Sequence, residues 1–273
     1  VYSSLNVIRD TKEQAGTYTN LSLALSETNY KAETLTGLTL IIKQAEYAVT
    51  LPTDLTATFG DKLSSVSLPE DSQGEWNWDG LYGESTVGNA GKNVFTAIFT
   101  PNDDNYAPAN YQLTVNVQKA KVTIPSAITS KTYTGERLKA DVSGTQDYTI
   151  FMNDGGIFVG NYNVMFVLSD FNNYQWDEEN KPNDVTINGA YLTRLFKITV
   201  AKAEITALNI TGWSYGATPN APTAKTNFGT ITYAYTKRGE DNYTTMVPTE
   251  AGDYTVKASV AGSNNWDKAD DVT

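Results

Sequence analysis

The sequence predicts an all-β chain built from tandem β-sandwich repeats in an extended array. Three observations carry this prediction: a short phrase that recurs four times, a strand pattern that recurs three times, and a composition rich in Tyr, Thr, Asn and Gly. Short alternating runs between polar turns are typical of β structure. A fixed internal repeat indicates that each copy is one structural unit placed beside the next.

The recurring phrase is a small or β-branched residue and a glycine, with Asn followed by an aromatic residue fourteen or fifteen positions after the glycine. Its copies run from Ala15-Gly16 to Asn29-Tyr30, from Ala90-Gly91 to Asn105-Tyr106, from Val159-Gly160 to Asn173-Tyr174, and from Ala251-Gly252 to Asn265-Trp266. We interpret the Asn-aromatic pair as a structural corner, because Asn tolerates tight turns and an aromatic residue placed identically in every copy is usually packing.

A second pattern is an alternating strand that ends in Gln-Ala or Lys-Ala, at Gln44-Ala45, Lys119-Ala120 and Lys202-Ala203. The residues three, five and seven positions before each alanine are all apolar: Leu38, Leu40 and Ile42; Leu113, Val115 and Val117; Phe196, Ile198 and Val200. This period-two placement predicts half-buried strands. An aromatic residue that enters a glycine turn follows each alanine: Phe59-Gly60, Tyr133 with Gly135, and Tyr215-Gly216.

These marks divide the chain into four segments. They are a partial repeat at 1–44, comprising its C-terminal half; a full repeat at 45–119; a full repeat at 120–202 with an insertion at 177–189; and a repeat at 203–273 that lacks its last strand. Strands are expected at 5–8, 38–42, 47–51, 74–78, 93–100, 111–117, 162–168 and 254–260. Sheets with one apolar face must cover each other, which favours an immunoglobulin-like β-sandwich of roughly seven strands.

Composition excludes several classes of function. With 31 acidic and 20 basic residues the net charge is -11, which repels phosphate backbones, so we expect no nucleic-acid partner. No apolar run is long enough to predict membrane insertion. Histidine and cysteine are both absent, which removes His-dependent triads, Cys nucleophiles and nearly all zinc, haem and iron–sulfur sites, and we expect no cofactor. Without a leader or an anchor in its sequence, the chain is expected to be a piece of a longer protein.

The remaining chemistry is weakly marked. A carboxylate pair for glycoside hydrolysis has candidates in Asp71 with Glu75 and in the acidic run at 177–179, but both stand in turn-like contexts, and we predict no enzyme. The stretches 102–105 and 170–173 lack the alternating spacing of calcium loops. Aromatic faces stack on sugars, so a carbohydrate-binding site near 172–176 or 76–82 is the alternative hypothesis. Its candidate residues are Tyr174, Trp176, Trp76 and Trp78.

Larger stretches resemble the Ig-like repeat modules of bacterial surface and secreted proteins, the MBG and YDG-type domains of adhesin-like proteins. The resemblance rests on 60–63 leading to 68–69 and 76–78, on 87–91, on 212–216 with 219–222, and on 248–254, while 15–45 looks like the trailing half of a YDG-type repeat. It implies a non-catalytic spacer stalk at the bacterial cell surface or secreted outside the cell. Its implied partners are neighbouring repeats, with glycans or host surface proteins as weak multivalent ligands.

Overall fold

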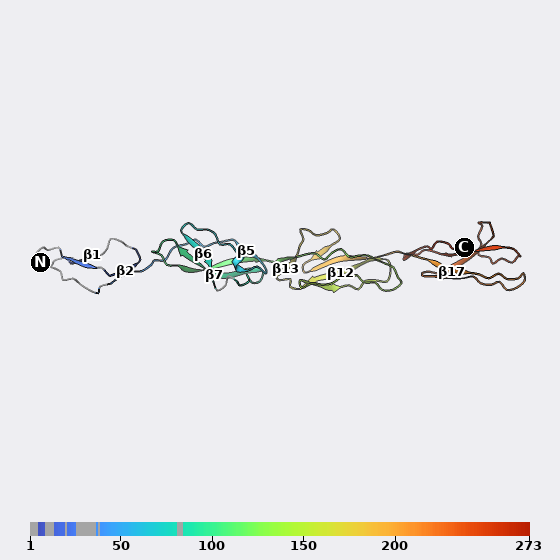
Figure 1. Cartoon of the computed structure of the whole chain (residues 1–273), viewed down its shortest axis with the longest axis horizontal. Coiled ribbons are helices and arrows are strands. Elements are labelled where there is room, and N and C mark those ends of the chain that lie inside the picture. Colours follow the sequence, from blue (N-terminus) through green and yellow to red (C-terminus); the bar gives the residue numbers. More distant parts are fainter. Residues whose placement is uncertain (1–4, 9–13, 20, 26–36, 38, 81–83) are drawn as a thin grey trace. The chain divides into compact units, whose positions relative to one another are not determined.

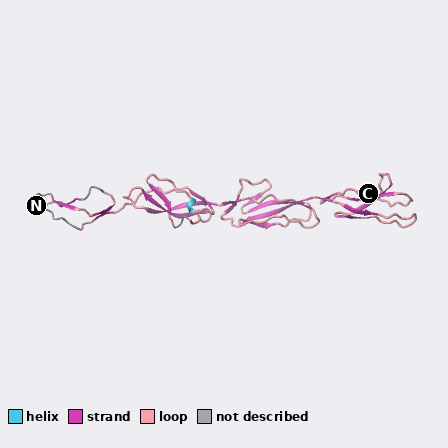
Figure 2. Cartoon of the chain, viewed as in Figure 1, coloured by secondary structure: helices cyan, strands magenta, loops and turns pink. Residues whose placement is uncertain are grey.

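The structure, a computed structural model, describes residues 5–8, 14–19, 21–25, 37, 39–80 and 84–273. Strands joined by loops make up nearly all of this part of the chain, and one short 3-10 turn, η1 (Leu63–Ser65), interrupts them (Figures 1 and 2). The predicted all-β class is confirmed. The chain divides into two compact units, residues 1–120 with 172–174, and residues 121–171 with 175–273.

The first part of unit 1 contains two short antiparallel pairs. Strand β1 (Leu5–Ile8) pairs with β3 (Ser22–Leu25), and β2 (Gly16–Tyr18) pairs with β4 (Leu40–Ile42). The strand predicted at 5–8 is confirmed, and the one predicted at 38–42 is confirmed over its last three residues. Leu38 and the pair Asn29-Tyr30 lie outside the described residues.

The rest of unit 1 is built on one four-stranded sheet in the order β5-β8-β7-β6. Its strands are β5 (Leu55–Thr58), β6 (Gly74–Trp78), β7 (Gly91–Pro101) and β8 (Ala109–Gln118). The pairs β6–β7 and β7–β8 are antiparallel, whereas β5 runs parallel to β8. The strands predicted at 74–78, 93–100 and 111–117 are therefore confirmed.

The strand predicted at 47–51 is wrong. Tyr47 and Val49 do pack against the core, but the backbone there joins no ladder, Leu51 is exposed, and Pro52 beside it has no N–H to donate. Apolar residues outside the strands cover the sheet: Tyr47, Val49, Phe59, Leu63, Val66, Leu68 and Val87. The arrangement is consistent with a sandwich in which one layer is a regular sheet and the other is made of turns and non-strand segments.

Unit 2 begins with a similar sheet in the order β10-β15-β12-β11, to which β14 adds by pairing with β15. Its strands are β10 (Lys131–Thr132), β11 (Tyr148–Met152), β12 (Gly160–Leu168), β14 (Thr186–Asn188) and β15 (Tyr191–Thr199). Two further short strands, β9 (Ala120–Val122) and β13 (Tyr174–Trp176), each have their first residue in unit 1 and their other two residues in unit 2. The strand predicted at 162–168 is confirmed, and the predicted insertion supplies β14.

One residue predicted on the buried face of β15 is exposed. Phe196 and Ile198 are fully buried, but Val200 is 47% exposed, because β15 ends at Thr199 and the chain continues into another strand, β16 (Ala201–Lys202). The sequence pattern predicts alternating burial through Val200, but the last buried residue of this alternation is Ile198.

The end of unit 2 contains three two-stranded pairs. Strand β16 pairs in parallel with β21 (Trp266–Asp267), and β17 (Ile205–Asn209) pairs with β18 (Thr223–Thr226). Strand β19 (Ile231–Lys237) pairs with β20 (Tyr254–Val260), which confirms the strand predicted at 254–260. Ala203, Ile205, Ala258, Val260 and Ala269 form the buried core there.

Strands β4, β8 and β15 occupy equivalent positions, and we call them the closing strands. Each pairs with the strand that begins at the glycine of the recurring phrase, and the glycine lies opposite an apolar residue near the end of the closing strand. The three pairs are Gly16 with Ile42, Gly91 with Val117, and Gly160 with Ile198. The internal repeat of the sequence thus corresponds to a repeated strand register.

Candidate functional site

The Asn of the recurring phrase makes the same long-range hydrogen bond in each described copy. The Ala15 backbone N–H donates to Asn105 Oδ1 over 2.6 Å, that of Ala90 to Asn173 Oδ1 over 2.8 Å, and that of Val159 to Asn265 Oδ1 over 2.9 Å. We call Asn105, Asn173 and Asn265 the junction asparagines. Each one accepts the N–H of the residue that stands directly before the glycine in the preceding copy of the phrase. The recurring phrase therefore links successive copies.

The main-chain carbonyl of each junction asparagine is also used. It accepts the N–H of Ala45, Ala120 or Ala201, over 2.8, 2.9 and 3.0 Å respectively. These alanines follow the closing strands. Each junction asparagine therefore holds two segments of chain at once, the start of the phrase strand through its side chain and the exit of the closing strand through its backbone.

The N–H groups that donate to the junction asparagines can do so because they lie just before the start of a strand. Ala15, Ala90 and Val159 directly precede strands that begin at glycine, so their N–H groups lie outside the ladder. A buried N–H without an acceptor is costly, and an Asn side chain can supply the acceptor. The side-chain amides also donate hydrogen bonds. Asn105 Nδ2 donates to Asp103 Oδ1 over 2.8 Å, and Asn173 Nδ2 donates to Asn89 Oδ1 over 3.2 Å.

The aromatic residue that follows two of the junction asparagines contacts the previous copy. The Tyr174 ring lies edge-on to Phe59 at 5.4 Å between centroids, and the Trp266 ring lies 5.9 Å from Tyr133. Phe59 and Tyr133 are the aromatic residues that enter a glycine turn. Their N–H groups donate to Gln118 and Thr199, at the ends of the closing strands β8 and β15. Ring, asparagine and closing strand thus form one repeated junction.

Replacing Asn173 by alanine should loosen the best-buried of these junctions. Asn173 is buried, and the change leaves the Ala90 N–H without its acceptor, so we expect a loss of about 1–3 kcal/mol in the free energy of unfolding. Amide hydrogen exchange at Ala90, followed with thermal unfolding of the full chain, measures it. The exposed Asn77→Ala on β6 is the matched control and should leave both unchanged. Unaltered exchange at Ala90 in Asn173→Ala would show that the bond is unimportant.

The predicted aromatic site residues of β6 lie in or against the core. Trp76 is 6% exposed and its ring lies 5.0 Å from that of Phe99. Trp78 is half-buried, donates its indole N–H to the Val66 carbonyl over 2.8 Å, and contacts Phe95. Both rings are engaged in packing.

The two candidates near the insertion do not form a shared exposed face. Trp176 is 4% exposed and donates its indole N–H to the Ala190 carbonyl over 3.1 Å. Tyr174 is half-buried against Phe59. The inserted segment is held by its own hydrogen bonds, including Lys181 Nζ to the Val185 carbonyl over 3.0 Å.

Three acidic residues of the candidate stretches, Asp71, Asp103 and Glu179, lie at turns or on the surface. Asp71 Oδ1 accepts the N–H of Gln73 over 2.9 Å, and Asp103 Oδ1 accepts that of Asn105 over 2.9 Å, so each side chain binds the backbone two residues ahead, as Asp does in turns. Glu179 pairs with Lys121 over 2.7 Å, and this carboxylate raises the pKa of the Lys121 ammonium. In the described part of the chain, no group of three or more Asp and Glu side chains is placed to hold a metal ion.

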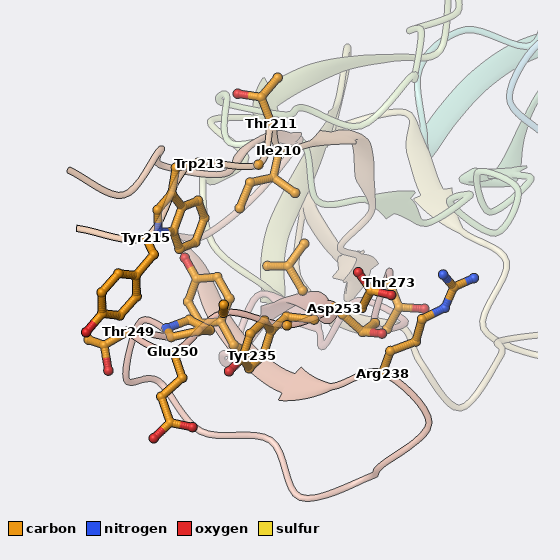
Figure 3. A pocket seen from close by; sticks show the side chains of 17 residues that line it. Ile210, Thr211, Trp213, Tyr215, Tyr235, Arg238, Thr249, Glu250, Asp253 and Thr273 are labelled. Atoms are coloured by element: carbon orange, nitrogen blue, oxygen red, sulfur yellow. The ribbon is translucent and has the colours of Figure 1, made fainter. Parts of the chain in front are cut away.

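A pocket of about 670 Å³ lies in the last segment and was not predicted from the sequence. Figure 3 shows Trp213 and Tyr215 at one end and Arg238 with Thr273 at the other. Tyr215 is 81% exposed, whereas Tyr235 is buried, and this burial raises the pKa of its phenol. Two features of the sequence mark this region, the aromatic-glycine turn Tyr215-Gly216 and the start of the recurring phrase at Ala251-Gly252. Their counterparts in the earlier copies form the junctions.

Two further findings bear on what the chain is. Among the described residues, no helix is long and apolar enough to cross a membrane. Compared with known proteins, the chain matches no family model, and no curated protein resembles it significantly.

Proposed function

We propose that the chain is a non-catalytic structural segment, a series of Ig-like β modules that spaces other parts of a large bacterial cell-surface or secreted protein. The observation that carries this proposal is the junction asparagine, which makes the same bond to the preceding copy at Asn105, Asn173 and Asn265. Links that recur at a fixed place between successive copies suit a chain that must hold its modules in line. Stability in such arrays is a sum of module and neighbour terms.

The use of the aromatic residues supports the spacer role over the carbohydrate-binding alternative. Sugar stacking needs an open ring face, whereas Trp76 and Trp176 lie in the core and Tyr174 contacts a neighbouring copy. The resemblance to MBG and YDG-type modules points to the same role outside the cell. Weak contacts with glycans or host proteins would then act through multivalency, because linked modules raise avidity without a strong single site.

Small-angle scattering of the full chain tests the proposal. A compact globule of this length would have a radius of gyration of about 19 Å, and an extended series of modules should exceed that value clearly. A value near 19 Å would contradict the spacer role. Comparing Asn173→Ala with Asn77→Ala tests the junction, since a weakened link should broaden the distance distribution in the first variant and leave the second unchanged.

A further inference from the structure

The outer face of the unit 2 sheet, opposite its core face, carries no charged side chain over three rows of residues. Residues directly opposite each other on neighbouring strands share a face, so the strand register gives the rows. They are Thr149, Val167, Tyr191 and Asn188; Met152, Met165, Thr193 and Thr186; and Asn163 with Leu195. The first charged residues along the same alternation, Asp147 and Lys197, lie one step beyond the two ends of the rows.

Phe151 reaches this face because β11 is irregular. The pairing of β11 with β12 shifts register between Ile150 and Met152, and a bulge of this kind redirects a side chain. The Phe151 ring lies 5.1 Å from the Tyr191 ring between centroids, at an interplanar angle of 69°. Tyr191 belongs to β15, and β12 lies between β11 and β15. The Phe151 ring therefore extends across β12 over the outer face, and we call this ring and the ten residues of the rows the neutral face.

The rings and polar groups of the neutral face are open to solvent. Phe151 is 59% exposed and Tyr191 is 39% exposed. Within the described residues, no hydrogen bond engages the side chains of Asn188 or Thr193. The outer face of the unit 1 sheet differs on both counts. The strand register places no aromatic residue on it, and its polar groups bind each other, as where Gln112 Nε2 donates to Thr96 Oγ1 over 2.9 Å.

The size and flatness of the neutral face limit what can bind there. Neighbouring strands lie about 4.8 Å apart and alternate residues about 6.8 Å apart, so three rows over four strands measure about 14 Å each way, a plan area of about 200 Å². A stable contact between two copies buries about 800 Å² on each, and an apolar ligand needs a concave pocket that encloses it. A sugar needs neither, because its C–H face stacks on one exposed ring while its hydroxyls reach polar groups beside the ring.

We propose that the neutral face binds an uncharged oligosaccharide, with Phe151 and Tyr191 as the stacking rings. Asn188 lies directly opposite Tyr191, and Thr193 is the next residue of β15 on the same face. Both side chains donate and accept hydrogen bonds, which matches a sugar hydroxyl. Since the rows offer no ionic partner, a neutral sugar is favoured over an acidic or sulfated one. This site lies apart from the aromatic positions that the sequence predicted, and it does not depend on the spacer role.

The test titrates the full chain with cellohexaose, mannohexaose and chitohexaose and follows backbone amide chemical shifts. At least one of these neutral sugars should give saturable shifts at Tyr191 and Thr193. Gln112 and Thr114, on the outer face of the unit 1 sheet, are the internal reference and should not shift.

Substitutions separate ring stacking from non-specific binding. Tyr191→Ala and Phe151→Ala should each raise the Kd by about tenfold, because each removes one stacking surface. Tyr191→Phe keeps the ring and should retain binding. Val94→Ala is the matched control, since Val94 is 58% exposed on the outer face of unit 1, and it should leave the Kd unchanged. Thermal unfolding of each variant checks that the sheet is intact.

Four outcomes would overturn the proposal. They are the absence of saturable shifts with all three sugars, unchanged affinity in Tyr191→Ala, equally tight binding of a sulfated heparin hexasaccharide, and a dimer in sedimentation that Tyr191→Ala dissociates. The last outcome would assign the neutral face to a contact between copies. None of them alters the radius of gyration expected of a single chain, so a failure here is distinct from a failure of the spacer role.

Discussion

Gly155→Ala should destabilise unit 2 by about 2–5 kcal/mol. Gly155 has a φ of +59°, where an L-residue costs about 1–2 kcal/mol. A Cβ added there would also overlap the backbone carbonyl of Leu138. That carbonyl accepts the Gly156 N–H over 3.0 Å, and Leu138 N–H donates to the Gly156 carbonyl over 2.8 Å. Relieving the overlap must therefore disturb a backbone bridge, and overpacking of this kind costs about 1–3 kcal/mol more.

Gly135→Ala is the matched control for Gly155→Ala. Its φ of +86° is also in the left-handed region, but a Cβ there meets no atom within 4 Å. In denaturant unfolding, Gly135→Ala should lose about 1–2 kcal/mol of the free energy of unfolding. The additional loss in Gly155→Ala should then come from the steric overlap alone. Equal losses in the two variants would show that the contact with Leu138 yields freely.

Asp184→Ala should cost about 3 kcal/mol, because it leaves a buried guanidinium without its partner. Arg194 is 3% exposed on the core face of β15, directly opposite Val164, and its Nη1 donates to Asp184 Oδ2 over 2.6 Å. A buried charge that loses its partner is penalised far more than the pair was worth. Thermal or urea unfolding of the full chain measures the loss.

The converse substitution separates the charge from the packing. Arg194→Met removes the buried charge and keeps most of the apolar stem, so it should cost much less than Asp184→Ala, and adding it to Asp184→Ala should restore most of the stability. Asp141→Ala breaks an exposed pair with Lys131 and should change stability by less than about 1 kcal/mol. The idea fails if Asp184→Ala proves as mild as Asp141→Ala.

Strands were the part of the fold that the sequence predicted best, because alternation is a local property. The ranges 5–8, 74–78 and 254–260 match β1, β6 and β20 residue for residue. The same local rule failed at 47–51, where alternating residues pack on the core without hydrogen bonds to a neighbouring strand. A strand requires both burial of one face and hydrogen bonds to a neighbouring strand. An alternating sequence pattern indicates only the burial.

The junction was beyond sequence reasoning for a different reason. The phrase predicts a corner at each Asn-aromatic pair, but the partner of Asn105 is 90 positions away and that of Asn265 is 106 positions away. Nothing in the phrase says which copy supplies the N–H. Arg194 was also missed, although its signal was present: it stands two residues from Leu192 and two from Phe196, on the same face of the strand.

The parallel pairing of β5 with β8 has a mechanical consequence. One strand lies near the start of its module and the other at its end, with Leu55 opposite Val115 and Thr58 opposite Gln118. Tension applied through the chain would pull these neighbours in opposite directions along their length, so their hydrogen bonds are loaded together in shear. The antiparallel hairpin-like pair β2–β4 would instead be opened one bond at a time, and it should yield under a smaller pull.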